Sequence, residues 1–107
     1  MAAKIGQRAN YRGLSLLWMR VLLGRDEPKS ASAAAMAERY REQMHVVPEI
    51  GDVLFYDASP AGDVALCVGI DQGRVHVLCL DGYGRPVVRQ HYAGAEGYVG
   101  AMRWPER

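Results

Sequence analysis

Two cysteines are the side chains of this sequence best suited to nucleophilic chemistry, because a thiolate beside an imidazole can attack a carbonyl carbon. Cys67 and Cys79 both fall in short apolar runs, and His76 lies between them. If residues 71–73 form a hairpin turn, Cys67 lies opposite Val77 and on the same sheet face as Cys79. His76 then points to the other face, because successive side chains of a strand alternate. The spacing therefore argues against a Cys67–His76 dyad.

The same register bears on the redox state of the two thiols. It makes Cys67 and Cys79 diagonal neighbours about 7 Å apart, which is at the margin of what a disulfide can bridge. Thiols in apolar strands more commonly pack as small hydrophobic groups. We therefore expect two free cysteines. The register also places Ile70 opposite Arg74 and Asp63 opposite Asp81.

The remaining histidines and acidic residues give no metal-binding pattern. His45 lies near the end of a predicted helix and His91 in a late strand, positions typical of surface or edge histidines. Asp57 and Asp63 flank the turn ASPAG without the alternating oxygen ligands of a calcium loop, so we interpret them as turn caps. A zinc site needs three or four converging ligands, and no spacing here indicates one. The sequence predicts neither a metal nor a cofactor.

Two helices are predicted ahead of these strands, within a helical region at residues 10–45. From residue 10 to residue 23, apolar residues recur at three- and four-residue spacing. They are Leu14, Leu17, Trp18, Val21 and Leu22. Gly24 is expected to end this helix. Ser30 or Ser32 is expected to cap a second helix, which continues to Met44.

The second part of the chain has the two-residue periodicity of β-strands, with glycine-containing turns between the apolar runs. These signals predict a β meander over residues 51–104, with strands at 52–57, 63–70, 74–80, 85–92 and 98–104. Two helices followed by an antiparallel sheet make an α+β fold, with both helices on one face of the sheet. We expect a single domain spanning residues 1–107. We expect the first helix to pack against Ala65, Cys67 and Val77.

The composition limits the classes of partner. Thirteen Lys and Arg against twelve Asp and Glu give a formal net charge of +1, so no general attraction to nucleic acid or to an anionic membrane is expected. The longest apolar run, residues 14–23, is about half of the ~20 residues that a membrane span needs, and Arg20 interrupts it. No apolar segment followed by a cleavage site opens the sequence, so no signal peptide is predicted. We expect synthesis in the cytoplasm, with neither nucleic acid nor membrane as a partner.

Five segments, taken in order, resemble a known family. NYRGLSLLW is similar to a helix that opens with a nucleophilic cysteine, SASAAAMAERY to the helical segment that follows, and GDVLFYD to a Gly-Asp strand. DVALCVG is similar to a strand led by a histidine, and YVGAMRWP to a closing strand of phage members. Over nearly its whole length the chain resembles the compact papain-like cysteine peptidases of bacterial cell walls, the NlpC-type and CHAP-type amidohydrolases, especially small phage-encoded ones. This resemblance implies a papain-like fold.

The residues at the family's catalytic positions depart from its pattern. The resemblance places the nucleophile position at Tyr11, or in a second register at Arg12, and the general-base histidine at Asp63. The third, orienting position falls near Asp81. Neither Tyr11 nor Arg12 can attack as a thiolate, and a carboxylate with a reference pKa near 4 is a poor base for a thiol. The resemblance therefore implies a degenerate site with no catalytic residues.

Two arrangements of this degenerate site remain open. In the first, the phenol of Tyr11 or the guanidinium of Arg12 hydrogen-bonds to Asp63 and replaces the catalytic pair by a structural contact. In the second, Asp63 and Asp81 each cap their own turn in water. A two-residue hairpin turn, in place of a three-residue one, would shift the pairing by one and favour the second arrangement.

These implications give a hypothesis of function. The chain is expected to be a catalytically inactive peptidase-fold protein, made in the host cytoplasm, that serves as a structural or binding component of a bacteriophage virion, with a tail location favoured. Expected partners are other phage structural proteins or further copies of the chain, with peptidoglycan as an alternative. Tyr and especially Trp and Arg are enriched at interface hot spots. The candidate interface residues are Tyr83, Arg85, Tyr98, Trp104 and Arg107.

Two other functions remain open from the sequence. One is an active peptidoglycan amidohydrolase or peptidase, acting in lysis or at a tail tip. The other is an immunity or inhibitor protein for such an enzyme.

Overall fold

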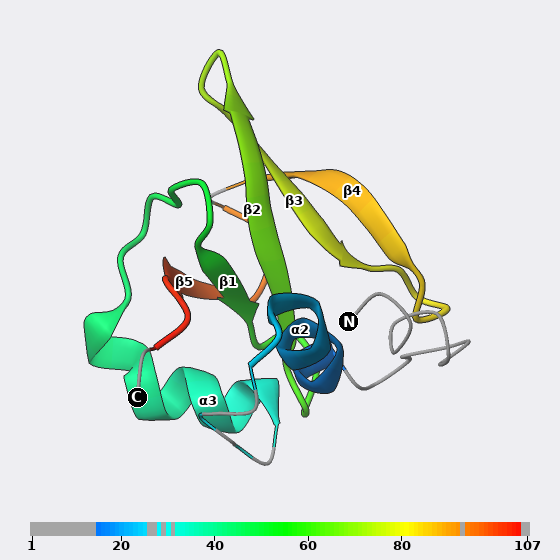
Figure 1. Ribbon diagram of the computed structural model, residues 1–107. Helices are drawn as coiled ribbons and strands as arrows, with labels where there is room; N and C mark the ends of the chain where they lie inside the picture. The colour runs from blue at the N-terminus through cyan, green and yellow to red at the C-terminus, as the bar shows by residue number, and fades with distance from the viewer. Residues whose placement is uncertain (1–14, 26–27, 29, 31, 93, 106–107) are drawn as a thin grey trace.

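Two α-helices and five β-strands form the described part of the chain (Figure 1). A computed structural model describes residues 15–25, 28, 30, 32–92 and 94–105. Helix α2 spans Ser15–Leu23 and α3 spans Ala33–Tyr40, followed by a short 3-10 helix η1 at Arg41–Gln43. The strands are β1 (Val53–Tyr56), β2 (Asp63–Asp71), β3 (Arg74–Leu80), β4 (Pro86–His91) and β5 (Tyr98–Met102). The predicted α+β class, with two helices and a five-stranded antiparallel sheet, is confirmed.

The sheet has the strand order β4-β3-β2-β1-β5, and all its pairings are antiparallel. Strands β1 to β4 follow one another as the predicted meander. Strand β5 departs from it, because it pairs with β1 at the far edge and not with β4. None of the described helices is long and apolar enough to cross a membrane.

The hairpin between β2 and β3 turns through two residues. Gln72 and Gly73 both have positive φ, 52° and 78°, which is the conformation that a tight two-residue hairpin turn requires. The pair next to the turn is therefore Asp71 with Arg74, and Ile70 pairs with Val75, so the predicted pairing of Ile70 with Arg74 is wrong by one residue.

A β-bulge restores the predicted register farther along this hairpin. The register shifts between Cys67 and Gly69, so Val68 is an extra residue on β2, and Cys67 lies opposite Val77 as expected. The neighbours of His76 on β3, Val75 and Val77, belong to the cluster that contains Cys67. His76 therefore points to the opposite face from Cys67, in agreement with the argument against a dyad.

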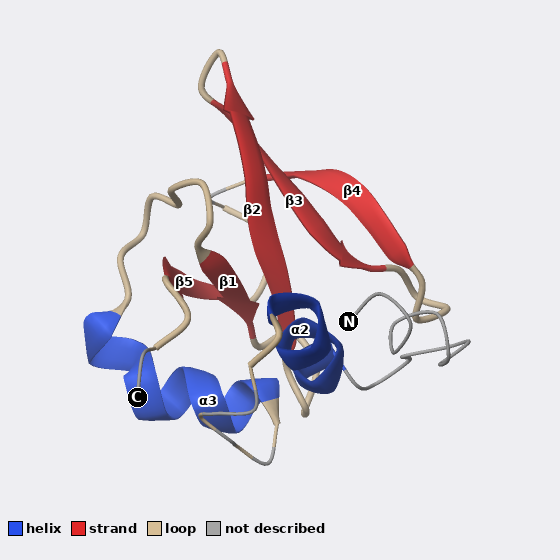
Figure 2. Cartoon of the chain, in the orientation of Figure 1, coloured by secondary structure: helices blue, strands red, loops and turns tan. Residues whose placement is uncertain are grey.

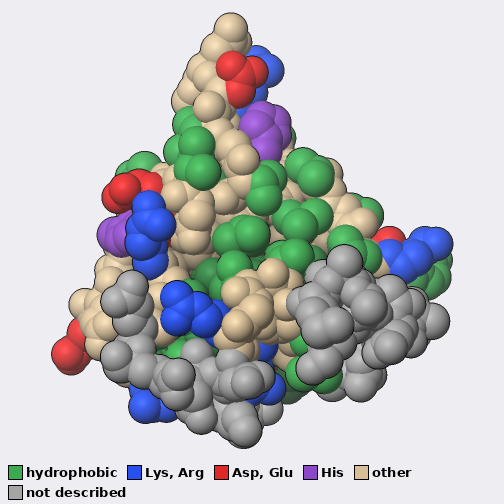
Figure 3. Space-filling model, viewed as in Figure 1, with side chains coloured by type: hydrophobic (Ala, Val, Ile, Leu, Met, Phe, Trp, Pro, Cys, Tyr) green, Lys and Arg blue, Asp and Glu red, His purple; other side chains and the backbone are tan. Residues whose placement is uncertain are grey.

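Both helices cover one face of the sheet. Figures 1 and 2 show α2 in front of β2 and α3 running below β1, and α2 packs on β2 while α3 packs on β1 and β2. The core on this helix side is built around large side chains with no exposed surface. They are Trp18, Met19, Met36, Val53 and Phe55. Figure 3 shows apolar side chains on the sheet above α2, where the helices do not reach.

The helix ends follow from local signals. Gly24 has φ of 68°, and its N–H donates to the carbonyl of Val21, so the predicted stop of α2 is confirmed. The hydroxyl of Ser32 accepts a hydrogen bond of 3.1 Å from the N–H of Ala35 and caps α3. Gly62, in the turn before β2, lies against the start of α3, where an added Cβ would be 2.7 Å from the N atom of Ala34. This close approach fixes α3 against the turn.

The predicted partners of the first helix lie on the wrong face. Ala65, Cys67 and Val77 belong to a second buried cluster, together with Leu54 and Ala101, which is separate from the helix-side core. Because side chains of β1 alternate, Leu54 faces away from the helices while Val53 and Phe55 face them. Cys67 is buried, with 1% of its surface exposed, but the sheet itself buries it.

The sheet curls around this second cluster. In a flat sheet, the outer strands of five would lie about 19 Å apart. Here the rings of His91 on β4 and Tyr98 on β5, the two edge strands, have centroids only 4.4 Å apart. Tyr56 on β1 contacts both rings. The face that the helices leave free is therefore the inside of a curled sheet, and we call it the inner face.

Candidate functional site

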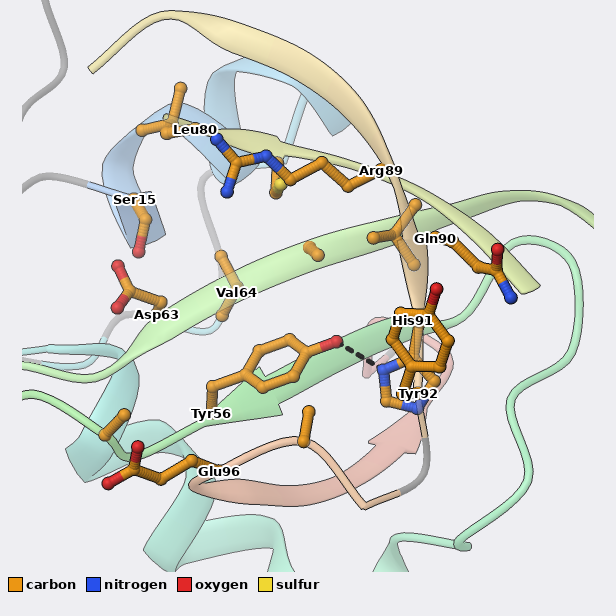
Figure 4. A pocket seen from close by; sticks show the side chains of 15 residues that line it. Ser15, Tyr56, Asp63, Val64, Leu80, Arg89, Gln90, His91, Tyr92 and Glu96 are labelled. Carbon is orange, nitrogen blue, oxygen red and sulfur yellow. Dashed lines mark hydrogen bonds between the residues drawn. The ribbon is translucent and has the colours of Figure 1, made fainter. Parts of the chain in front are cut away.

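A pocket of about 350 Å³ opens on the inner face, next to the first described residue of α2. Figure 4 shows polar side chains from α2, β1, β2, β4 and the segment after β4 around its walls. Apolar residues of β2 and β3 complete the lining. The residues that the arguments below use are Ser15, Tyr56, Asp63, Cys79, Arg89, His91 and Glu96.

A tyrosine–histidine pair forms one end of the pocket. The hydroxyl of Tyr56 and Nδ1 of His91 are 2.7 Å apart (Figure 4). Burial lowers the pKa of His91 and raises the pKa of Tyr56 above its ordinary value, so both groups are neutral near pH 7. The phenol then donates to Nδ1, and the ring proton lies on Nε2. Nε2 is buried and has no hydrogen-bond partner among the described residues.

The prediction of a surface or edge position for His91 holds for the edge, because β4 is an edge strand. Only 8% of the residue is exposed, however, because the curl of the sheet turns this side chain against β1 and β5. The aromatic ring of Tyr98 packs on His91 at an interplanar angle of 64°. Tyr98 has its own pKa raised to about 12, chiefly by burial.

Cys79 is the thiol in the pocket wall. It is half-buried, and burial raises its pKa, with an opposing effect from the guanidinium of Arg89 and a reinforcing one from the carboxylates of Asp63 and Asp81. The thiol form therefore predominates at neutral pH. His91 pairs with Val75, four residues along β3 from Cys79, which is about 13 Å. No imidazole in the described part of the chain is hydrogen-bonded to this thiol.

Cys67, the other cysteine, also has a thiol that is not activated as a nucleophile. Burial raises its pKa, and its Sγ lies 3.9 Å from the carbonyl oxygen of Gly69. Both cysteines are free, as predicted. Neither thiol therefore has the environment that lowers the pKa of a catalytic cysteine.

Asp63 stands at the rim of the pocket where β2 begins. Its carboxylate accepts a hydrogen bond of 3.4 Å from the hydroxyl of Ser59, within the turn that precedes β2. Burial raises the pKa of Asp63 and this hydrogen bond lowers it in part. Ser15 lines the same end of the pocket, and Figure 4 shows its side chain pointing toward Asp63. The predicted contacts of Tyr11 and Arg12 lie outside the described residues and stay predictions.

Asp81 is a turn cap. Its Oδ1 accepts hydrogen bonds from the backbone N–H groups of Tyr83 at 2.8 Å and Arg85 at 3.0 Å. Its Oδ2 lies 3.4 Å from Nε of Arg85. The bond from the Arg85 backbone is the largest cause that lowers the pKa of Asp81. This carboxylate is thus engaged by its own turn, as the second of the two predicted arrangements requires of it.

The candidate interface residues occupy different environments. Tyr83 is 67% exposed, and the guanidinium of Arg85 lies 5.1 Å from the centre of its ring. Tyr98 is half-buried and donates its hydroxyl proton to the carbonyl of Val46. Trp104 packs in the helix-side core with 8% of its surface exposed. Arg107 lies outside the described residues.

A second polar pair, His45 and Asp52, lies at the other end of the inner face. Asp52 is 1% exposed, and its Oδ2 lies 2.6 Å from Nε2 of His45 and 2.9 Å from the N–H of Glu49. His45 was expected at the surface, and 43% of its side chain is indeed exposed. The buried carboxylate that it contacts was not predicted, although the alternation Asp52, Leu54, Tyr56 places it on the inner face.

Within the described ranges, no three His, Cys, Asp or Glu side chains converge to hold a metal ion. Comparison with known proteins adds no relative: the chain matches no protein-family model, no curated protein and no solved structure.

Proposed function

We propose that this chain is a non-catalytic member of the papain-like cell-wall peptidase fold that acts as a binding or structural component. The observation that carries the proposal is the environment of Cys79. This thiol lines the pocket at the level of the degenerate site, yet its neighbours are carboxylates and a guanidinium, and its pKa is raised. Cysteine peptidases need a thiol whose pKa is lowered by an imidazole.

The geometry around Asp63 supports the resemblance behind this proposal. In the family, the helix that bears the nucleophile starts beside the strand led by the catalytic histidine. Here Ser15 of α2 and Asp63 at the start of β2 line one end of the same pocket. The order of elements, two helices followed by an antiparallel sheet that curls, is compatible with a papain-like arrangement.

We extend the proposal to a bacteriophage virion, with a tail location favoured. This step rests on the resemblance of the chain to small phage-encoded members of the family, in particular that of the segment YVGAMRWP to their closing strand. A fold that has lost its catalytic groups can persist when its surfaces assemble with partners.

Hydrolysis of purified, dye-labelled peptidoglycan tests the non-catalytic part. We expect the full chain to release no dye above the buffer blank at neutral pH, and the Cys79→Ala variant to behave in the same way. Release that iodoacetamide abolishes, and that Cys79→Ala removes, would overturn the proposal in favour of an active amidohydrolase.

Mass spectrometry of washed phage particles tests the structural part. We expect peptides of this chain in particles purified by density gradient, in constant ratio to a known tail protein. Detection in the infected-cell lysate with loss from the washed particles would contradict a virion role.

A further inference from the structure

The loop of residues 45–51 presents aliphatic side chains to solvent. Val46 is 65% exposed, Val47 is 74% exposed and Ile50 is 55% exposed, all within five residues. Figure 3 shows apolar, acidic, basic and histidine side chains together at the left of the view, where Figure 1 places this loop. Apolar side chains gathered on an exposed surface with polar neighbours are typical of a site that another molecule covers.

Hydrogen bonds hold this loop in one conformation. The N–H of His45 donates to the carbonyl of Ala101 at 2.9 Å, and the N–H of Ala101 donates back at 2.8 Å. The hydroxyl of Tyr98 donates to the carbonyl of Val46 at 2.5 Å. The buried carboxylate of Asp52 lies 2.6 Å from Nε2 of His45. A loop held in this way loses little further conformational freedom when a partner binds.

A hollow of about 510 Å³ adjoins the loop. It lies between the end of α2 and the segment after β5, and the described residues that line it are Leu23, Arg25, Gly51, Arg103, Trp104 and Pro105. Gly51 has φ of 93°, and an added Cβ would lie 3.3 Å from Nη1 of Arg103. Glycine at this position adopts the positive φ without strain, and its lack of a side chain leaves room for the guanidinium of Arg103 next to the backbone.

Among the described residues, no carboxylate forms an ion pair with either arginine of the hollow. The basic–acidic side-chain contacts that the structure describes are His45–Asp52 and Arg85–Asp81. Arg25 and Arg103 take part in neither. Guanidinium groups bind carboxylates through paired hydrogen bonds, so a hollow lined by two of them favours a carboxylate from outside.

We propose that the loop of residues 45–51 and the arginine-lined hollow together form a docking surface for a segment of a partner protein that carries an acidic side chain beside aliphatic ones. The acidic group enters the hollow between Arg25 and Arg103. The aliphatic side chains cover Val47 and Ile50, which precedes Gly51 at the edge of the hollow. This surface is separate from the pocket on the inner face, so it does not depend on the proposal made for that pocket.

A partner protein fits this surface better than a membrane does. The exposed Glu49 lies between Val47 and Ile50 in the sequence, and a carboxylate at the tip of an apolar loop opposes insertion into an anionic bilayer. The hollow is concave, so a protruding side chain of a protein can enter it, whereas a flat membrane surface would not fill it.

Selection of binders from a random 12-residue peptide library on the immobilised full chain tests the proposal. We expect enriched peptides to contain Asp or Glu next to aliphatic residues. A synthetic peptide of the enriched sequence should bind the Val47→Asp variant about tenfold or more weakly, and likewise the Arg25→Glu/Arg103→Glu variant. Selection repeated on this double variant should enrich Lys or Arg in place of the acidic residues.

Matched variants elsewhere on the surface are the controls. Val88→Asp replaces another exposed valine, 62% exposed on β4, and Arg74→Glu reverses a charge at the tip of the β2–β3 hairpin. Both should bind the peptide as the unaltered chain does, and circular dichroism should show the same thermal transition for all variants.

Three results would overturn the proposal. The first is a library that yields no enriched sequence. The second is an enriched peptide whose binding is unchanged by the Val47→Asp and double-arginine variants. The third is sedimentation of the chain with vesicles of anionic phospholipid that Val47→Asp abolishes, because the loop would then be a membrane contact.

Discussion

The two faces of the sheet bury similar numbers of strand positions by different means. On the helix side, α2 and α3 cover Val53 and Phe55 with large apolar side chains such as Trp18. On the inner face neither described helix lies over the strands, and Leu54 and Cys67 are buried because the sheet curls on itself. A face covered by helices can be filled with apolar groups. A face closed by curling retains a pocket, and polar side chains line it.

The inner face therefore holds two buried polar pairs. Asp52, just before β1, contacts His45, seven residues earlier in the chain, and Tyr56 on β1 contacts His91 on β4. The helix side carries one buried polar atom of note, Nε1 of Trp18, which has no partner in the described residues. Apolar packing stabilises the helix side, and hydrogen bonds between polar side chains contribute more on the inner face. Substitutions on the two faces should therefore have different effects on stability.

The largest expected effect is on the helix side. Trp18→Ala leaves a cavity in the core and should lower the free energy of unfolding by about 3 to 5 kcal/mol. Trp18→Phe is the matched control, since it keeps most of the ring volume and breaks no hydrogen bond, and it should lower stability by much less. Urea denaturation of both variants measures the difference. Equal losses would mean that the indole nitrogen, and not packing, stabilises this face.

The next effect is at the end of the inner face. Asp52→Asn keeps the side-chain shape but weakens two charge-assisted hydrogen bonds, and it should lower the free energy of unfolding by about 1 to 3 kcal/mol. Asp57→Asn, at the exposed end of β1, should change it by less than about 0.5 kcal/mol. A loss as small as that of the Asp57 control would show that the Asp52 contacts contribute little to this face.

A smaller effect concerns acid. Because burial lowers the pKa of His91 in the folded protein, the unfolded chain binds a proton more readily at this residue. The contribution of neutral His91 to stability is full above about pH 6.5 and falls as the pH drops below that value toward the lowered folded-state pKa. His91→Gln should flatten the decline in stability below pH 6.5. Thermal unfolding at a series of pH values measures it, and an unchanged slope in the variant would contradict the assignment.

The smallest expected effect is a gain in stability, at Asp63. Burial raises the pKa of Asp63, so its ionised form is less stable in the folded protein than in the unfolded chain. Asp63→Asn should raise the melting temperature slightly at pH 7, and this gain should vanish below about pH 4, where the carboxyl is protonated in both states. Asp71→Asn, at the exposed far end of β2, is the control. A lower melting temperature for Asp63→Asn at pH 7 would show that its bond to Ser59 outweighs the desolvation.

The sequence predicts the elements of this fold well and their faces poorly. Glycine-containing segments precede β1 and separate the strands, so the strand limits fall within about two residues of those observed. The face of β2 that meets the helices could not be chosen, because Val64 and Leu66 on one side and Ala65 and Cys67 on the other are all apolar. A two-residue periodicity identifies the burying face only when the opposite face is polar.

The contacts of the candidate site lack a local signal. Tyr56 and His91 are 35 residues apart, and they meet only because β5 returns to β1 and curls the sheet. The sequence of the segment before β5 does not indicate which edge of the sheet that strand will join. Asp81 was predictable as a turn cap because its partners lie within four residues. Local capping is encoded in short stretches, whereas the pocket depends on the whole topology.

The backbone bridge between His45 and Ala101 also limits self-aggregation. An open strand edge offers unpaired N–H and C=O groups to any other extended chain, and sheets can grow through such edges into fibres. Both hydrogen bonds of this bridge occupy groups on the outer side of β5, so a sixth strand could not align along its middle without displacing them. At the opposite edge, β4 begins with Pro86, which has no N–H to donate. Within the described residues, the bridge thus blocks the middle of the β5 edge, and the proline removes one donor at the start of the β4 edge.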